Sequence, residues 1–132
     1  MNEKKSKVIL VVEDERPLLE AIKTKLEKMG FVVLTAKTYK EAIAHFQNNK
    51  QIDVLWLDHY LLGVETGFDL LAYMKKRKNL KQIPIFVVTN TGAPDKRQTY
   101  LQLGAVKYYV KSDHGLSDII KEIKNYLKNP DK

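Results

Sequence analysis

Five polar side chains with complementary chemistry stand at the ends of apolar runs in this sequence. They are Glu13, Asp14, Asp58, Thr89 and Lys111. If those runs are neighbouring parallel strands, their carboxyl ends meet at one edge of a sheet, and the five side chains lie together there. Any one of them alone is ordinary, because a polar residue often begins the loop after a strand. The inference therefore depends on the whole set and its order.

Three carboxylates of this set would crowd together, and Lys111 would neutralise only one of the three negative charges. Crowded carboxylates either share a proton or bind a cation. An all-oxygen cluster with open positions favours Mg²⁺, with Mn²⁺ as a substitute, and Mg²⁺ suits phosphate chemistry. A carboxylate beside such an ion can act as a nucleophile toward a phosphoryl group, and Asp58 is the natural candidate. Lys111 and the ion would neutralise charge on the transferred oxygens, and Thr89 would donate a hydrogen bond to one of them.

The elements that must position these residues alternate regularly along the chain. Five apolar runs, mostly of β-branched or aromatic residues, are typical of strands covered on both faces, as in a parallel sheet. They occupy residues 8–12, 31–34, 54–57, 85–88 and 108–110. A segment with apolar residues at helical spacing follows each run. This alternation predicts a three-layer α/β fold with a parallel sheet and right-handed crossovers.

Local signals predict where the helices begin and end. Pro17 marks the first turn of the first helix and Gly30 its end. Thr38 and Glu41 form a capping-box pattern at the start of the second helix. The boundaries of the remaining helices are predicted near Gly67, Pro94, Gly104, Leu116 and Leu127.

Length and composition restrict the class of protein. The 132 residues suit a single domain over 1–132, with a core of about 7–127 and short tails at 1–6 and 129–132. The chain has no cysteine, which excludes disulfides, cysteine metal sites and thiol nucleophiles. The longest aliphatic run, Val8–Val12, is too short to cross a bilayer or to form a signal-peptide core. We therefore expect a cytoplasmic protein without a membrane partner.

The net charge of +7 is concentrated in one part of the chain. Nine basic residues and a single acidic one, Asp95, lie between Ala72 and Lys111. A basic surplus suggests nucleic acid or an acidic protein as a partner. No helix-turn-helix pattern follows the last predicted helix, so direct nucleic-acid binding is the lesser expectation. The greater one is a docking surface for an acidic protein that includes Lys96 and Arg97.

Taken in order, the polar residues and the alternating elements resemble the receiver domain of two-component response regulators. The likeness is strongest to the stand-alone type typified by the chemotaxis response regulator, and it extends from about Lys7 to Leu127. The resemblance implies a flavodoxin-like, doubly wound sheet of five parallel strands in the order 2-1-3-4-5. Periodicity alone does not supply that order.

The resemblance also implies a role for each acidic residue. Glu13 and Asp14 match the acidic pocket of the family and would hold Mg²⁺. Asp58, which lies 44 residues after Asp14, matches the phospho-acceptor. The carboxylate of Asp58 and the backbone carbonyl of Tyr60 would complete the metal ligands.

Three further residues match the parts of the family that respond to phosphorylation. Thr89 matches the conserved hydroxyl, Lys111 the invariant lysine 22 residues later, and Tyr108 the aromatic switch. By this resemblance, a sensor histidine kinase or a histidine phosphotransfer protein donates a phosphoryl group from a phosphohistidine to Asp58. Thr89 and Lys111 then move inward, and Tyr108 swings toward the space that Thr89 vacates. A downstream protein would dock on the face formed by the fourth helix, fifth strand and fifth helix, and the chain would catalyse only its own phosphorylation and dephosphorylation.

Several positions depart from the family pattern. Ser112 follows Lys111 where the family has proline, which predicts either a trans bond with a shifted loop or a strained cis bond. Leu62 and Gly63 replace a Pro-Gly turn, and the loop to Gly67 is one residue longer, which leaves the start of the third helix open. Asn90 replaces a small residue and would either crowd the phosphate or donate a hydrogen bond to it.

Tyr60, two residues after the phospho-acceptor position, is a further departure. Its side chain would overhang the phosphate, and we hypothesise that this bulk hinders water and slows the loss of phosphate from Asp58. A tyrosine that only packs on the loop is the alternative. The neighbouring His59 is expected to be an exposed loop histidine without a ligand role.

Other classes of protein share some of these features. An aspartyl-phosphate phosphatase of the haloacid dehalogenase type also uses a strand-end aspartate with Mg²⁺, but it needs a second aspartate where this chain has Tyr60. A flavodoxin-like binding protein or a basic nucleic-acid-binding α/β module would share the topology. The segment 13–17 is acidic and free of glycine, which is unfavourable for binding phosphate without a metal.

Overall fold

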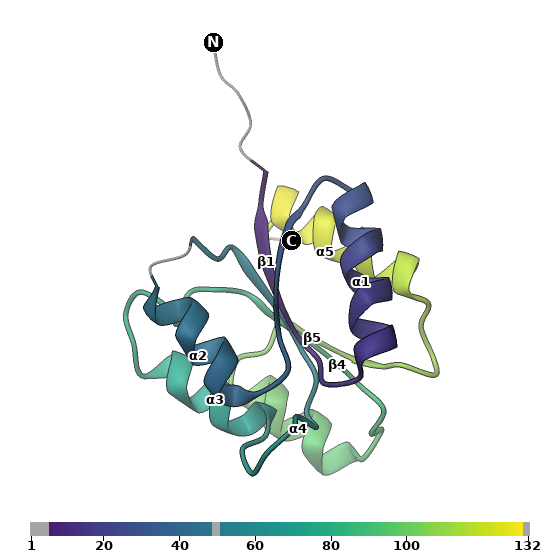
Figure 1. Ribbon diagram of the computed structural model, residues 1–132. Helices are drawn as coiled ribbons and strands as arrows, with labels where there is room; N and C mark the ends of the chain where they lie inside the picture. Colours follow the sequence, from purple (N-terminus) through teal and green to yellow (C-terminus); the bar gives the residue numbers. More distant parts are fainter. Residues whose placement is uncertain (1–5, 49–50, 131–132) are drawn as a thin grey trace.

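The computed structural model describes residues 6–48 and 51–130. Residues 1–5 and 131–132, which make up most of the expected tails, lie outside the described residues. Five strands and five helices alternate (Figure 1): β1 (Val8–Val12), α1 (Arg16–Lys28), β2 (Val32–Ala36), α2 (Tyr39–Gln47), β3 (Val54–Leu57), α3 (Gly67–Lys75), β4 (Ile85–Thr89), α4 (Pro94–Gln102), β5 (Lys107–Val110) and α5 (Leu116–Lys128). Within this part of the chain, no helix has the length and apolar character needed to cross a bilayer.

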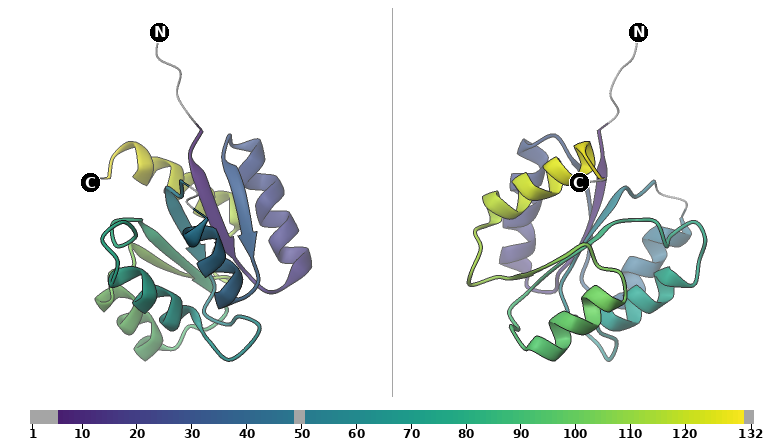
Figure 2. Two further views of the ribbon diagram at one scale, coloured as in Figure 1. Left: turned by 60° about the vertical axis from the view of Figure 1, so that its left-hand side comes forward. Right: turned by 180° about the vertical axis from the view of Figure 1, so that it is seen from behind.

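The five strands form one sheet in the order β2-β1-β3-β4-β5, and every pairing is parallel. Helices α1 and α5 cover one face of the sheet, and α2, α3 and α4 cover the other (Figure 1, Figure 2). The predicted doubly wound, five-stranded α/β fold and its strand order are therefore confirmed.

Successive strand residues alternate between two hydrophobic cores, one on each face of the sheet. In β3, Leu55 and Leu57 face the core under α2, α3 and α4, whereas Val54 and Trp56 face the core under α1 and α5. All four are fully buried, which explains why this strand is a continuous apolar run. Strand β2 differs, because it lies at the edge of the sheet and Val32 is 49% exposed. Both faces of β2 are nevertheless covered, because Leu34 packs against the core under α2 and Val33 against the core under α1, so the expectation holds for this strand beyond its exposed first residue.

Helix α1 begins and ends, and α2 begins, where the local signals predict. Pro17 lies in the first turn of α1, and Gly30, with a φ of 95°, follows its end. At the start of α2, the Oγ1 of Thr38 accepts a hydrogen bond from the N–H of Glu41 at 3.0 Å. The carboxylate of Glu41 accepts from the N–H of Lys37 at 2.8 Å, one residue before the cap.

Hydrogen bonds hold the connection from β3 to α3 at its middle and at the start of α3. Thr66 caps α3: its Oγ1 accepts from the N–H of Phe68 at 3.2 Å, and the carboxylate of Asp69 accepts from the N–H of Thr66 at 2.7 Å. This capping box starts α3 directly after Thr66. The N–H of Leu62 donates to the carbonyl of Lys37 at 3.3 Å, which ties the loop to the start of α2.

The peptide bond between Lys111 and Ser112 is trans, like every other peptide bond among the described residues. Of the two outcomes that the missing proline left open, the trans bond is therefore found. The N–H of Asp113 donates to the carbonyl of Val110 at 2.9 Å, which makes a tight turn directly after β5.

Candidate functional site

Three carboxylates lie together at the carboxyl ends of β1 and β3, which are neighbours in the sheet. The last residues of the two strands, Val12 and Leu57, pair in register, so Glu13 and Asp58 follow at the same level. One carboxylate oxygen from each of Glu13, Asp14 and Asp58 lies within 4.8 Å of the other two. Glu13 is fully buried and Asp58 is 4% exposed. The structure thus brings together the acidic residues that the sequence placed at strand ends.

Lys111 extends one positive charge into this cluster from the end of β5. Its Nζ lies 2.8 Å from Oε1 of Glu13 and 3.3 Å from Oδ2 of Asp58. Burial by itself lowers the pKa of Lys111, but the hydrogen bond to Glu13 and the attraction of both carboxylates outweigh it, and the pKa is raised. Lys111 is therefore a firmly protonated ammonium shared by two carboxylates.

Glu13 has a raised pKa because it is buried beside another carboxylate. Burial is the largest cause, and the charge of Asp58 adds to it, whereas hydrogen bonds from Lys111 and from the N–H of Glu15 act in the opposite direction. One ammonium faces three carboxylates. A further cation would compensate the remaining charge, and oxygen ligands of this kind suit a hard divalent ion.

Thr89 and Tyr108 lie on the adjacent strands β4 and β5. Thr89 is fully buried, and its Oγ1 has no hydrogen-bond partner in the part of the chain that the structure describes. The hydroxyl of Tyr108, which is also buried, donates to the carbonyl of Thr91 at 2.5 Å. The guanidinium of Arg97 lies 5.6 Å from the Tyr108 ring centroid and donates to the Tyr108 carbonyl at 3.4 Å. The Tyr108 side chain is thus held in a buried position, and Arg97 of α4 contacts both its ring and its backbone carbonyl.

The backbone of Tyr60 lies beside the Asp58 carboxylate. Its N–H donates to Oδ1 of Asp58 at 3.4 Å. The Tyr60 side chain is 50% exposed, and its ring stands edge-on to His59 with a centroid distance of 4.8 Å. That the ring slows the loss of phosphate from Asp58 stays a prediction.

His59 is buried, so the expectation of an exposed loop histidine was wrong. Only 4% of it is exposed, its Nδ1 lies 2.6 Å from the hydroxyl of Tyr100 in α4, and its ring packs against Phe68 of α3. Burial, and then the positive charge of Lys96, lowers the pKa of His59. The sequence did not signal this contact because its residues meet only after α3 and α4 pack over the loop.

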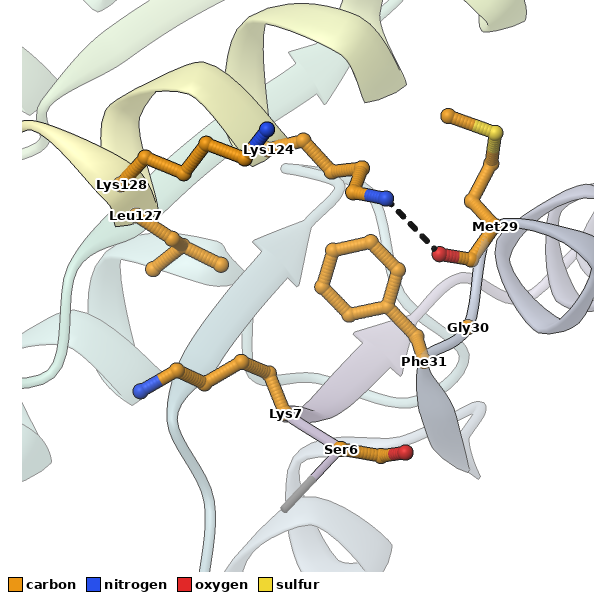
Figure 3. A pocket seen from close by; sticks show the side chains of 8 residues that line it. All are labelled: Ser6, Lys7, Met29, Gly30, Phe31, Lys124, Leu127 and Lys128. Carbon is orange, nitrogen blue, oxygen red and sulfur yellow. Dashed lines mark hydrogen bonds between the residues drawn. The ribbon is translucent and has the colours of Figure 1, made fainter. Parts of the chain in front are cut away.

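A separate hollow lies at the opposite end of the sheet, where Lys7 precedes β1 and Phe31 precedes β2 (Figure 3). It is lined by Ser6, Lys7, Met29, Gly30, Phe31, Lys124, Leu127 and Lys128. The Nζ of Lys124 donates to the carbonyl of Met29 at 3.2 Å and joins α5 to the end of α1. None of its described lining residues carries a carboxylate, so this hollow is not part of the acidic cluster.

Comparison with known proteins gives the family. The family model of the response regulator receiver domain matches residues 9–124. The phosphate regulon transcriptional regulatory protein PhoB of Pseudomonas aeruginosa is 34% identical over 105 residues, which are 80% of this chain and 45% of PhoB. The chain therefore spans less than half the length of this curated relative.

Solved structures share the fold over nearly the whole chain. The chemotaxis protein CheY4 of Vibrio cholerae superposes with a TM-score of 0.82 at 26% identity, covering 92% of this chain and 98% of that one. The Mn(2+)-bound form of response regulator Rcp1 gives a TM-score of 0.76 at 26% identity, covering 91% of each chain. With the family model matched over most of its length, this chain belongs to the receiver domain family of two-component response regulators.

Proposed function

We propose that Asp58 accepts a phosphoryl group from a phosphohistidine of a sensor histidine kinase or a histidine phosphotransfer protein. In this reaction an oxygen of Asp58 attacks phosphorus, the P–N bond of the donor breaks, and the imidazole leaves. The position of Asp58 carries the proposal: it lies at a strand end with the carboxylates of Glu13 and Asp14 within 4.8 Å and with Nζ of Lys111 at 3.3 Å.

Mg²⁺, or Mn²⁺ in its place, would be held by the carboxylates of Glu13, Asp14 and Asp58 and by the backbone carbonyl of Tyr60. The residues fit such an ion because the donors are all oxygen and because Lys111 leaves negative charge uncompensated around buried Glu13. When bound, the ion supplies positive charge to the oxygens of the transferred group. The existence of a Mn(2+)-bound form of the structurally similar Rcp1 supports Mn²⁺ as the substitute.

The remaining site residues stabilise the transferred group and respond to it. Lys111, already in contact with Asp58, neutralises charge on a phosphoryl oxygen. The buried hydroxyl of Thr89, which has no partner among the described residues, gains an acceptor when it donates to another such oxygen. Tyr108 then leaves its bond with Thr91 and turns toward the space that Thr89 vacates, which makes the domain a two-state switch.

The face formed by α4, β5 and α5 is the proposed docking surface for a downstream protein. Tyr108 of β5 contacts Arg97 of α4, so a movement of Tyr108 reaches this face. Lys96 and Arg97 give the face positive charge, which favours an acidic protein over nucleic acid as the partner. We place the domain in the cytoplasm with its kinase and expect it to act on no substrate except its own phosphoryl group.

A small phosphodonor, acetyl phosphate, tests the acceptor. With Mg²⁺ present, intact mass spectrometry of the wild-type chain should show the addition of one phosphoryl group. Asp58→Asn should abolish the addition, and the matched control Asp95→Asn, at the exposed first turn of α4, should retain it. Phosphorylation that persists in Asp58→Asn would exclude Asp58 as the acceptor.

Thermal unfolding with and without Mg²⁺ tests the metal ligands. A cation that binds only the folded chain raises the unfolding midpoint. Asp14→Asn removes one ligand without breaking the contacts of Lys111 with Glu13 and Asp58, and it relieves repulsion among the carboxylates. The metal-free variant should therefore be at least as stable as the wild type but should lose most of the Mg²⁺-induced shift. A full shift in Asp14→Asn excludes Asp14 from the site.

A further inference from the structure

The hydrogen bond between His59 and Tyr100 joins the loop that carries Asp58 to α4. His59 directly follows Asp58, and Tyr100 is fully buried in the second half of α4. Nδ1 of His59 and the hydroxyl oxygen of Tyr100 are 2.6 Å apart. The two rings are nearly perpendicular, at 88°, with a centroid distance of 5.6 Å. The contact is thus a well-oriented polar link inside an otherwise apolar core.

The chemistry of the two groups assigns the Tyr100 hydroxyl as the donor. Burial raises the pKa of Tyr100, so its hydroxyl is protonated near pH 7 and can donate. Within the described residues, His59 is the only hydrogen-bond partner of the hydroxyl. Donation to Nδ1 uses the single hydroxyl proton, whereas the reverse direction would leave it without an acceptor. The imidazole proton is then on Nε2.

Gly67, the first residue of α3, fixes the same loop from the other side. Its N–H donates to the carbonyl of His59 at 2.9 Å. A Cβ at this position would collide with the Tyr100 hydroxyl and would lie 3.0 Å from the carbonyl oxygen of Asp58. The backbone after Asp58 is therefore enclosed between α3 and α4, and a larger residue than glycine does not fit there.

We propose that Tyr100 and His59 are positioning residues that hold residues 58–60 in the orientation required for metal binding and phosphoryl transfer. The proposal rests on the function proposed above, because this segment supplies the Asp58 carboxylate and the Tyr60 carbonyl. The Tyr100 hydroxyl bonds to the side chain of His59 and so joins this segment to α4.

This link gives the phosphorylation site a second connection to α4. The first runs through Thr89 and Tyr108, and the second runs from Asp58 through His59 to Tyr100. Coupling free energies are reciprocal. If the contact with α4 stabilises the loop conformation that binds metal or phosphate, then binding of metal or phosphate stabilises that contact by the same free energy. Tyr100 thus couples the state of Asp58 directly to one helix of the proposed docking face.

Amide hydrogen exchange of Gly67 tests the positioning in the metal-free, full-length chain. Tyr100→Phe removes the hydroxyl and keeps the ring, and we expect the Gly67 amide to exchange about two- to tenfold faster. Tyr109→Phe is the matched control, because it removes a tyrosine hydrogen bond of 2.5 Å, to Glu122, on the opposite face of the sheet. Equal exchange at Gly67 in the two variants overturns the proposal.

Calorimetric titration with Mn²⁺ tests the consequence for the site. Tyr100→Phe and His59→Leu should weaken Mn²⁺ binding by about two- to tenfold. His59→Asn should bind Mn²⁺ more tightly than His59→Leu and close to the wild-type affinity, because the amide oxygen can take the place of Nδ1 as the acceptor. Tyr109→Phe should bind Mn²⁺ like the wild type. If Tyr100 contributed only to overall stability, the Mn²⁺ affinity of all four variants would fall in proportion to their loss of unfolding free energy. That pattern contradicts the proposal.

The two experiments separate this inference from the proposed function. A wild-type chain that binds no Mn²⁺ and takes no phosphoryl group from acetyl phosphate contradicts the proposed function, and the exchange of Gly67 then decides the role of Tyr100 alone. A wild-type chain that does both, with Tyr100→Phe indistinguishable from it in affinity, leaves the function standing and overturns the positioning role.

Discussion

Tyr108 donates its hydroxyl proton to the carbonyl oxygen of Thr91 at 2.5 Å, and this bond joins β5 to the loop that leads into α4. Burial is the largest reason for the raised pKa of Tyr108, so the hydroxyl stays protonated throughout the neutral range. The ring is only 4% exposed. Any turn of Tyr108 in the proposed switch must therefore break this bond.

Tyr108→Phe should lower the free energy of unfolding by about 0.5–1.5 kcal/mol, because the variant loses one intramolecular hydrogen bond and keeps the ring. Urea denaturation of the metal-free protein measures the change. Tyr39→Phe in α2 is the control, since no hydrogen bond of its hydroxyl occurs among the described residues. Equal stability of Tyr108→Phe and the control would mean that water replaces the Tyr108 hydroxyl at Thr91 without loss.

Gly67→Ala should destabilise the protein by about 1–3 kcal/mol, as overpacking of a close contact does. Helix propensity alone predicts the opposite sign, because alanine is favoured over glycine in a helix. The new methyl group would collide with the hydroxyl of Tyr100, so the loss should shrink when Gly67→Ala is made in a Tyr100→Phe background.

Gly92→Ala is the control for that experiment. Its Cβ would lie 3.7 Å from Cγ2 of Val110, which is an ordinary contact, and the change in stability should stay within about 0.5 kcal/mol. Denaturant unfolding compares the variants. If Gly67→Ala costs as much with Phe as with Tyr at position 100, the backbone carbonyl of Asp58 and not the hydroxyl is the group that excludes a side chain.

The fold was predictable because its signals are local. Apolar runs, Pro17, Gly30 and the cap at Thr38 each act within a few residues, and the alternation of elements then restricts the architecture. The strand order needed the family resemblance, because periodicity does not say which strands are neighbours. The edge position of β2, which exposes Val32, follows from that order and not from the composition of the strand.

The acidic cluster was predictable for a similar reason, and the buried polar contacts were not. Strand ends in a parallel sheet meet at one edge, so Glu13 and Asp58 could be placed together from the sequence. The bond between His59 and Tyr100 joins residues 41 positions apart, and it depends on how α4 packs over the loop. No local pattern carries that information, so a histidine in a loop was expected at the surface.

Tyr109→Phe should raise the pKa of Glu122. The hydrogen bond from Tyr109 is the main cause of the lowered pKa of this carboxyl group, and the ion pair with Lys107 at 3.4 Å adds to it. NMR titration of the Glu122 carboxyl carbon in the two proteins measures the shift, and Tyr39→Phe should leave it unchanged. An unaltered Glu122 pKa in Tyr109→Phe would assign the effect to Lys107.

The sign of the effect on stability follows from linkage. A carboxyl group with a folded-state pKa below its unfolded value of 4.5 stabilises the protein above that value, and the contribution is lost as the pH falls through the folded pKa. Tyr109→Phe should therefore lower stability near neutral pH and weaken the dependence of stability on pH below about 4.5. The change is small, because 46% of the Glu122 side chain is exposed to solvent.

Tyr60→Asn should shorten the lifetime of the acyl phosphate on Asp58 several-fold. The Tyr60 N–H contacts the Asp58 carboxylate, and its half-exposed ring rests edge-on against His59. We expect this ring to hinder the approach of water to a phosphoryl group on Asp58. A smaller side chain admits water to the phosphorus atom more easily. The lifetime is measured by intact mass after acetyl phosphate is removed. Tyr60→Phe, which keeps the bulk without the hydroxyl, should retain the wild-type lifetime, and an unchanged or longer lifetime in Tyr60→Asn contradicts the shielding role.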